Sequence, residues 1–122
     1  MPEQKKLFLT MFQMEMEDSY GDILYFSGVN ERKFKDNEIT NYVYTENKAF
    51  LEHEASGVKE LIAAIGSINA EDYKDVTEMA RAVGELLTNK AKEQDDPQAV
   101  YGIIARKIKK VLAYILDYNE VF

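Results

Sequence analysis

Two hydrophobic periods divide the chain near residue 56. After this point, apolar residues recur three and four positions apart, which is typical of helices that bury one stripe. Between residues 5 and 55, apolar and polar residues alternate over short runs, which indicates β-strands. The pattern therefore predicts an α+β fold, in which a small antiparallel sheet is followed by three helices within one domain of residues 1–122.

The predicted sheet has three or four strands. The first covers residues 5–17, where Phe8, Thr10, Phe12, Met14 and Met16 fall on one face, and the second covers residues 23–27. Residues 18–22 have turn chemistry that would close a hairpin between these two strands. A third strand is predicted at residues 39–45.

Residues 46–55 fit two structures. They could form a fourth strand after a turn at residues 45–48, or the first turns of a helix. We favour the strand slightly, because Ala49, Leu51 and His53 alternate with the residues between them.

The clearest helical pattern lies at residues 97–118. Its stripe has spacings of three and four residues and consists of Tyr101, Ile104, Ile108, Val111 and Ile115. Three further apolar residues widen the stripe: Ile103, Leu112 and Leu116. A stripe this wide predicts a helix that is covered on two sides, or one that also forms an interface.

Two more helices are predicted before it. One begins at Ser56 and ends at Gly66, which suit an N-cap and a helix C-terminus respectively. The other follows Asn69 and has a one-sided apolar stripe up to Leu87. A short acidic loop joins it to the last helix, so the last two helices should form a long antiparallel hairpin.

Composition narrows the class of protein. The chain has 122 residues, a net charge of −7 and no cysteine, which excludes disulfides and thiolate metal sites. It contains no apolar run of the ~20 residues that would span a bilayer. The N-terminal residues do not resemble a signal peptide, so we expect a cytoplasmic protein without a membrane partner.

The chain offers little catalytic chemistry. His53 lies between Glu52 and Glu54, but adjacent residues point apart and therefore do not form a metal site. Carboxylate pairs such as Glu15 with Glu17 would share a strand face and could hold a cation, although a solvated edge is the favoured interpretation. No glycine-rich nucleotide motif occurs. We therefore expect no catalytic residues, no cofactor and no metal.

The densest basic cluster lies at residues 106–110. A solvated helix face is the favoured interpretation, and pairing with the acidic N-terminal half of another copy is an alternative. Direct nucleic-acid binding is disfavoured because the chain as a whole is acidic.

Function is predicted only as a class. The favoured hypothesis is a non-enzymatic adaptor or inhibitor that binds a protein partner through an acidic surface with tyrosines and methionines, as mobile-element or viral accessory proteins do. The candidate interface residues are Glu15, Glu17, Tyr42, Tyr44, Ile103, Leu112 and Leu116. The alternatives are a homo-oligomeric structural protein that uses the last helix as its self-interface, and a protein that binds a small ligand or metal.

Overall fold

Every regular element in the described residues is a helix, so the predicted α+β fold is wrong. The computed structural model describes residues 2–121, with side chains for residues 3–117. The elements, in chain order, are α1 (Pro2–Lys35), α2 (Asn41–Ile65), the short 3₁₀ helix η1 (Ala70–Asp72), α3 (Val76–Glu93) and α4 (Gln98–Val121). This part of the chain contains no strand.

The predicted first strand is helical because its large apolar residues are four positions apart. Phe8, Phe12 and Met16 share one face in a strand and also in a helix, so alternation alone did not distinguish the two structures. In α1 all three side chains are buried, and the rings of Phe8 and Phe12 stack with centroids 5.7 Å apart. Thr10 and Met14, which completed the strand pattern, are exposed.

The predicted hairpin turn at residues 18–22 lies in the middle of α1, and the second strand also belongs to this helix. Gly21 is exposed, and a Cβ added there would meet no atom within 4 Å. A helix tolerates such a glycine at a cost of about 1 kcal/mol, which the packing of a 34-residue helix outweighs.

The chain reverses at residues 36–40 instead. Asn37 has a φ of 61°, a left-handed conformation that asparagine adopts more readily than most residues. The side chain of Thr40 caps α2 by accepting a hydrogen bond of 3.2 Å from the backbone N–H of Val43. Residues 41–55 are therefore helical, so the predicted third and fourth strands are wrong as well.

The helices predicted after residue 56 are present, although their N-termini differ. Gly66 follows the last residue of α2, as expected, but α2 begins well before Ser56. Asn69 caps η1, and α3 is capped by Asp75, whose carboxylate accepts a hydrogen bond of 2.8 Å from the N–H of Glu78. Local capping chemistry thus explains the starts of α2, η1 and α3.

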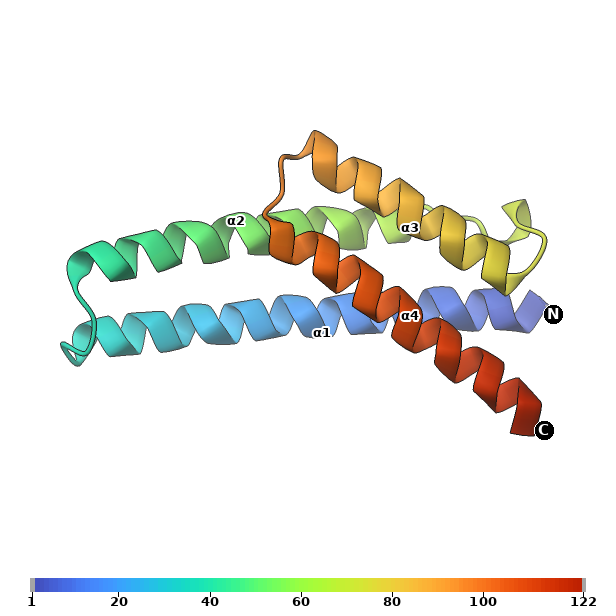
Figure 1. The fold of residues 1–122 in the computed structure, drawn as a ribbon, viewed down its shortest axis with the longest axis horizontal. Helices are drawn as coiled ribbons and strands as arrows, with labels where there is room; N and C mark the ends of the chain where they lie inside the picture. The colour runs from blue at the N-terminus through green and yellow to red at the C-terminus, as the bar shows by residue number, and fades with distance from the viewer. Residues whose placement is uncertain (1, 122) are drawn as a thin grey trace.

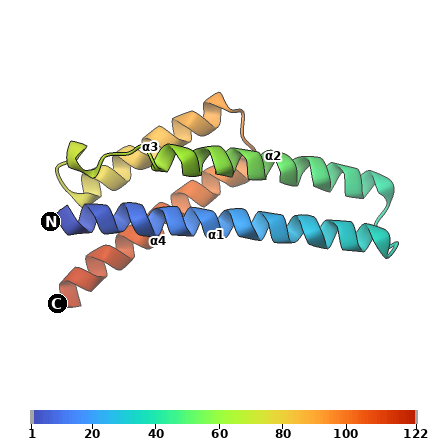
Figure 2. The same cartoon turned by 180° about the vertical axis from the view of Figure 1, so that it is seen from behind.

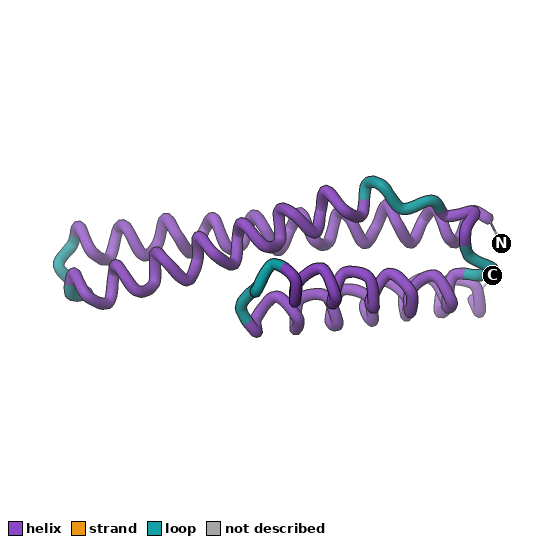
Figure 3. Tube along the Cα trace, turned by 90° about the horizontal axis from the view of Figure 1, so that it is seen from above, coloured by secondary structure: helices purple, strands orange, loops and turns teal. Residues whose placement is uncertain are grey.

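The four long helices form two layers (Figure 1, Figure 3). One layer is the antiparallel α1–α2 hairpin, and the other is the α3–α4 pair, in which α4 crosses α1 obliquely. The view from behind shows that the second layer covers only the half of the hairpin nearest the N-terminus (Figure 2). We call the projecting part of the hairpin, residues 24–51, the arm, and the rest of the described chain the body.

The hydrophobic core lies in the body. Its fully buried side chains come from all four long helices and include Phe8, Phe12, Met16, Val58, Leu61, Met79, Val83, Leu87, Val100, Ile104 and Val111. The arm residues are all described, and among them Asn30 alone is buried. The arm is therefore an extension that two helices build without a core of its own.

Candidate functional site

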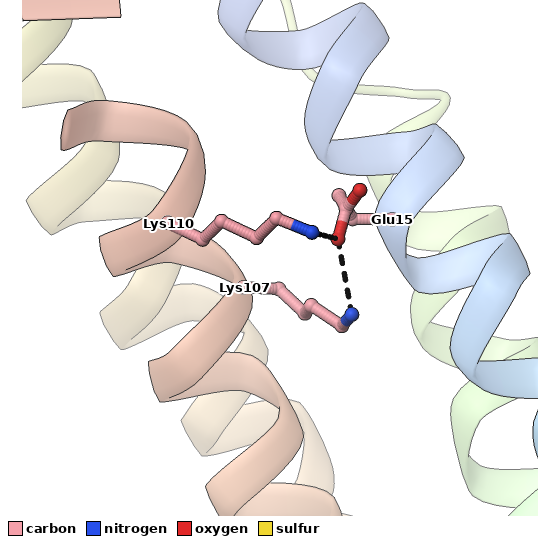
Figure 4. A network of polar contacts seen from close by, with 3 residues as sticks. All are labelled: Glu15, Lys107 and Lys110. Carbon is pink, nitrogen blue, oxygen red and sulfur yellow. Dashed lines mark hydrogen bonds and ion pairs between the residues drawn. The ribbon is translucent and has the colours of Figure 1, made fainter. Parts of the chain in front are cut away.

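Glu15, one of the predicted interface residues, lies between α1 and α4 (Figure 4). Its Oε1 accepts hydrogen bonds from Lys110 Nζ at 2.9 Å and from Lys107 Nζ at 3.0 Å. These bonds, first from Lys110 and then from Lys107, lower the pKa of the Glu15 carboxyl. Part of the basic cluster therefore pairs with the acidic N-terminal half of the same chain.

A strand would have placed Glu15 and Glu17 on one face, and the helix α1 separates them; Tyr42 and Tyr44, two further candidate interface residues, lie apart on α2. Residues two apart in a helix point about 200° away from each other. Glu17 is exposed beside Gln13, and Tyr42 is 73 % exposed. The ring of Tyr44 instead stacks on Phe34 with centroids 4.4 Å apart, inside the arm.

The three residues that widen the stripe of α4 have different surroundings. Ile103 is buried, and Leu112 is half-buried against the core. Leu116 is 39 % exposed, so it alone of the three stays available for an interface. The α1–α2 layer, rather than a sheet, covers the second flank of this helix.

A continuous stripe of α1 faces α4 in the body and has no cover in the arm. Its members recur at helical spacing and are Glu15, Ser19, Asp22, Phe26, Val29 and Lys33. Glu15 is bound by α4, whereas Phe26 is 56 % exposed. We call this row the α4-facing stripe of α1.

The helix α2 carries a matching row. Gly57 packs against the α3–α4 loop, since a Cβ added there would lie 2.5 Å from Oδ1 of Asp96. One turn closer to the tip is Glu54, and then comes Phe50, which is 50 % exposed. The two rows therefore become uncovered at the same level of the hairpin.

The exposed parts of the two rows enclose a cavity of about 270 Å³, which we call the arm groove. It is lined by Phe26, Val29, Asn30, Lys33, Asn47, Phe50 and Leu51. Asn30 at its base donates a hydrogen bond to the carbonyl of Tyr44 and accepts one from Asn47, both at 3.1 Å. These bonds hold the two arm helices in register beneath an apolar surface.

A second cavity lies where α1, α2 and α4 meet. This junction pocket has a volume of about 190 Å³ and is lined by Ser19, Asp22, Ile23, Phe26, Glu54, Ile103 and Arg106. Phe26 lines the arm groove as well, so the two cavities adjoin. Glu54 is only 8 % exposed, and burial raises the pKa of its carboxyl.

A larger hollow of about 630 Å³ lies between α3 and α4. Gly84 opens it, since a Cβ there would lie 3.1 Å from Cδ1 of Ile108. Its rim carries the exposed ion pair of Arg81 and Glu85, at 3.1 Å. Arg81 and Glu85 pair with each other, whereas Lys92 lines the hollow without an ion pair among the described residues.

Metal-binding clusters and membrane-spanning helices are two further features that would indicate the kind of site. The described residues bring together no group of three or more His, Cys, Asp or Glu side chains that could hold a metal ion. Within the same residues, none of the helices combines the length and hydropathy that a bilayer span requires.

The arm groove and the junction pocket were missed at the level of sequence. Phe26 had been assigned to a strand and Glu54 to a segment of uncertain structure. Apolar periodicity could not have identified either cavity, because only Phe26 and Val29 are apolar among the six α1 positions from Glu15 to Lys33.

Comparisons with known proteins provide no relative for this chain. No protein-family model matches it, and no curated protein and no solved structure has significant similarity to it.

Proposed function

We propose that the protein is a non-catalytic interaction module that binds a protein partner through the arm groove. The observation that carries this proposal is the concentration of exposed apolar side chains on a projecting arm that has no core. The arm contributes six large exposed apolar residues: Leu24, Tyr25, Phe26, Tyr42, Val43 and Phe50. Two of them, Phe26 and Phe50, line the arm groove, and exposed apolar side chains that lie at a groove are characteristic of interaction sites.

The shape of the groove favours a helical occupant. In the body, the α4-facing stripe is covered by a helix, and beyond the body the same stripe continues without one. An amphipathic helix from a partner would extend the second layer along the arm and bury the rings of Phe26 and Phe50. Helix-in-groove binding of this type relies on a few large apolar anchors.

Electrostatics favour a basic partner. The arm has four acidic and four basic residues at positions 24–51, so the net charge of −7 lies in the rest of the chain. A negative body beside the groove attracts a positively charged partner and speeds its association. An inhibitor that occupies the basic surface of a nucleic-acid-binding protein is one form of this proposal, with the cytoplasm as its location, or the host cytoplasm for a mobile-element protein.

Capture from the native lysate tests the proposal when it compares matched variants. The double variant Phe26→Ser with Phe50→Ser removes the anchors, and Leu24→Ser with Tyr42→Ser removes equally exposed side chains that do not line the groove. The expected result is a protein retained by the parent chain and by the control pair but lost from the groove pair. Equal retention by both pairs would refute a role for the groove.

The salt dependence of the captured complex tests the electrostatic part. Raising the ionic strength from 0.05 to 0.5 M, values chosen to span about 14 to 4 Å of Debye screening, should weaken a complex with a basic partner steeply. An affinity that does not change with salt would exclude the basic partner. It would not test the groove, which the two double variants test.

Self-association through α4 is the second candidate function. It is supported by Leu116, which is 39 % exposed on α4. Sedimentation equilibrium of the parent chain and of Leu116→Ser distinguishes the two functions. A dimer that Leu116→Ser dissociates would favour self-association, whereas a strict monomer at high concentration would exclude it.

A further inference from the structure

The junction pocket contains a carboxylate without a partner. Glu54 is 8 % exposed, yet among the described residues it makes no hydrogen bond or ion pair. Ser19, which is 6 % exposed and lines the same pocket, likewise has no described partner. The side-chain oxygens of both residues remain accessible from the pocket, because no fully buried oxygen or nitrogen of the described buried side chains lacks a hydrogen-bond partner. The pocket therefore contains unused hydrogen-bond acceptors.

A second carboxylate, that of Asp22, lines the pocket from α1. Asp22 and Glu54 approach from different helices, so their negative charges add in the space between α1 and α2. Two carboxylates and one guanidinium line the pocket, so its charged lining carries a net charge of −1. The local field thus favours a cation.

Arg106 is the one cationic side chain that lines the pocket, and it does not neutralise these carboxylates. Its guanidinium folds back along α4 over Gly102, where an added Cβ would lie 3.0 Å from Nη1. It forms no ion pair with Asp22 or Glu54 in the described structure. Gly102 thereby provides the space that keeps this arginine on its own helix.

We propose that the junction pocket receives an arginine side chain from the protein whose helix occupies the arm groove. This inference rests on the proposed function, because the groove directs the partner helix toward the pocket. Phe26 lines both cavities, so a helix anchored on its ring would carry a side chain at its body-facing end into the pocket.

Arginine fits this pocket better than lysine does. Its planar guanidinium has five N–H donors that suit carboxylate oxygens, and it is less strongly hydrated than an ammonium group. It can donate to Glu54 and Asp22 while its face lies against the ring of Phe26. Ser19 Oγ adds an acceptor at the pocket wall. A metal ion is a poorer occupant, since the described residues bring no three ligands of the usual types together.

Butylguanidinium, titrated into the full-length protein, tests the pocket without any partner. It copies the end of an arginine side chain, and butylammonium and uncharged butylurea are its matched controls. NMR spectra should show saturable shifts at Ser19, Asp22, Glu54 and Ile103, with butylguanidinium binding more tightly than butylammonium. Butylurea should cause no saturable shift.

Variants assign the binding to Glu54. Glu54→Gln should weaken butylguanidinium binding about tenfold, which is the size expected for one charge-assisted hydrogen bond. Glu52→Gln removes an exposed carboxylate from the same helix and should have no effect. Arg106→Gln should strengthen binding, because it removes the one cation that lines the pocket.

Three outcomes would overturn the inference: shifts spread evenly over exposed carboxylates, equal binding of butylurea, or unchanged affinity in Glu54→Gln. Tighter binding of butylammonium would overturn the choice of arginine. These outcomes are independent of the proposed function, which fails if Phe26→Ser with Phe50→Ser leaves partner capture intact. If those changes abolish capture while Glu54→Gln leaves both capture and butylguanidinium binding unchanged, only the inference fails.

Discussion

The body and the arm are built from the same two helices but are stabilised differently. In the body, α1 and α2 contribute Phe8, Phe12 and Leu61 to one buried cluster, and the α3–α4 layer completes this hydrophobic core. In the arm, the seam contains the Asn30–Asn47 hydrogen bond and the stacked rings of Phe34 and Tyr44. A polar seam fixes the register of the two helices but buries little apolar surface. Most of the stability therefore comes from the body, whereas the arm keeps apolar surface exposed for binding.

This difference teaches that exposure has different meanings in the two regions. In the body, an exposed side chain such as Leu7 lies on the outside of an element that already buries its other face. In the arm, Phe26 and Phe50 lie on the face that the second layer covers elsewhere. The following changes test whether stability and binding are separated in this way, beginning with the largest expected effect.

Truncating a large apolar side chain should lower the free energy of unfolding much more in the body than in the arm. Leu61→Ala in the body should lower the free energy of unfolding by about 2–5 kcal/mol, since it leaves a cavity among buried side chains. Phe50→Ala in the arm should change it by less than about 1 kcal/mol, because the ring is half exposed. Urea denaturation of both variants measures this contrast, and equal losses would contradict it.

A pair of helical glycines provides the next test. Gly57→Ala would place a Cβ 2.5 Å from Oδ1 of Asp96. The Asp96 side chain is buried, and its Oδ2 accepts a hydrogen bond of 2.8 Å from Nε2 of Gln94. The expected loss is about 1–3 kcal/mol, because the α3–α4 loop must shift to make room.

Gly28→Ala in the arm is the matched control. A Cβ added at Gly28 would meet no atom within 4 Å, so alanine should raise helix stability by up to about 1 kcal/mol. Thermal melts of the two variants should therefore shift in opposite directions. A stable Gly57→Ala would mean that α2 and the α3–α4 loop are less tightly packed than these contacts indicate.

The buried amide of the arm should have a local effect. Asn30→Ala removes its bonds to Tyr44 and Asn47 and should cost about 1 kcal/mol. Hydrogen exchange should become faster at residues 24–51 while the body stays protected, because no core residue of the body is altered. Uniformly faster exchange would show that the arm and the body unfold as one unit. Asn89→Ala, an exposed change in α3, is the control.

Two glutamates should give small pH effects of opposite sign. The pKa of Glu15 is lowered, so its stabilising contribution is present above the ordinary glutamate pKa of about 4.3 and is lost as the pH falls through its lower folded value. Glu15→Gln should therefore reduce the melting temperature at pH 7. The loss in the free energy of unfolding should be less than about 1 kcal/mol, because Lys110 is largely exposed. This difference from the parent should disappear at acidic pH.

The pKa of Glu54 is raised by burial, so its ionised form opposes folding. Protonation of the carboxyl removes this cost. The cost is therefore absent at pH values below the ordinary glutamate pKa, and it reaches its full size once the pH exceeds the raised pKa of the folded state. Glu54→Gln should thus increase the melting temperature at pH 7 and have no effect near pH 4. A destabilised Glu54→Gln at pH 7 would indicate that the carboxylate already has a favourable partner.

Much of the second half of the chain could be predicted from its local pattern. The stripe from Tyr101 to Ile115 and the position of Gly66 agree with α4 and with the end of α2. Even here the start of α3 was misplaced, since Asn69 and Asp75 are both good N-caps and the chain uses each for a different helix. Capping residues specify that a helix starts, but packing selects which cap begins the long one.

Of the predicted interface residues, the structure leaves Glu17, Tyr42 and Leu116 open to solvent. It assigns Glu15 to a bridge with α4 and buries Ile103. The candidate site itself involves Phe26, Phe50 and Glu54, whose shared surface exists only when two helices lie side by side.

The sequence by itself determined the helices whose apolar residues follow spacings of three and four, because this pattern fits the period of a helix and does not fit the alternation of a strand. It did not determine the structure of residues 5–55, where a spacing of four satisfies both a strand and a helix. There the tertiary structure decided: α1 and α2 bury each other's stripes, and the α3–α4 layer is too short to cover them fully. The arm is uncovered because the α1–α2 hairpin is longer than the α3–α4 pair. This difference cannot be recognised from any one helix by itself.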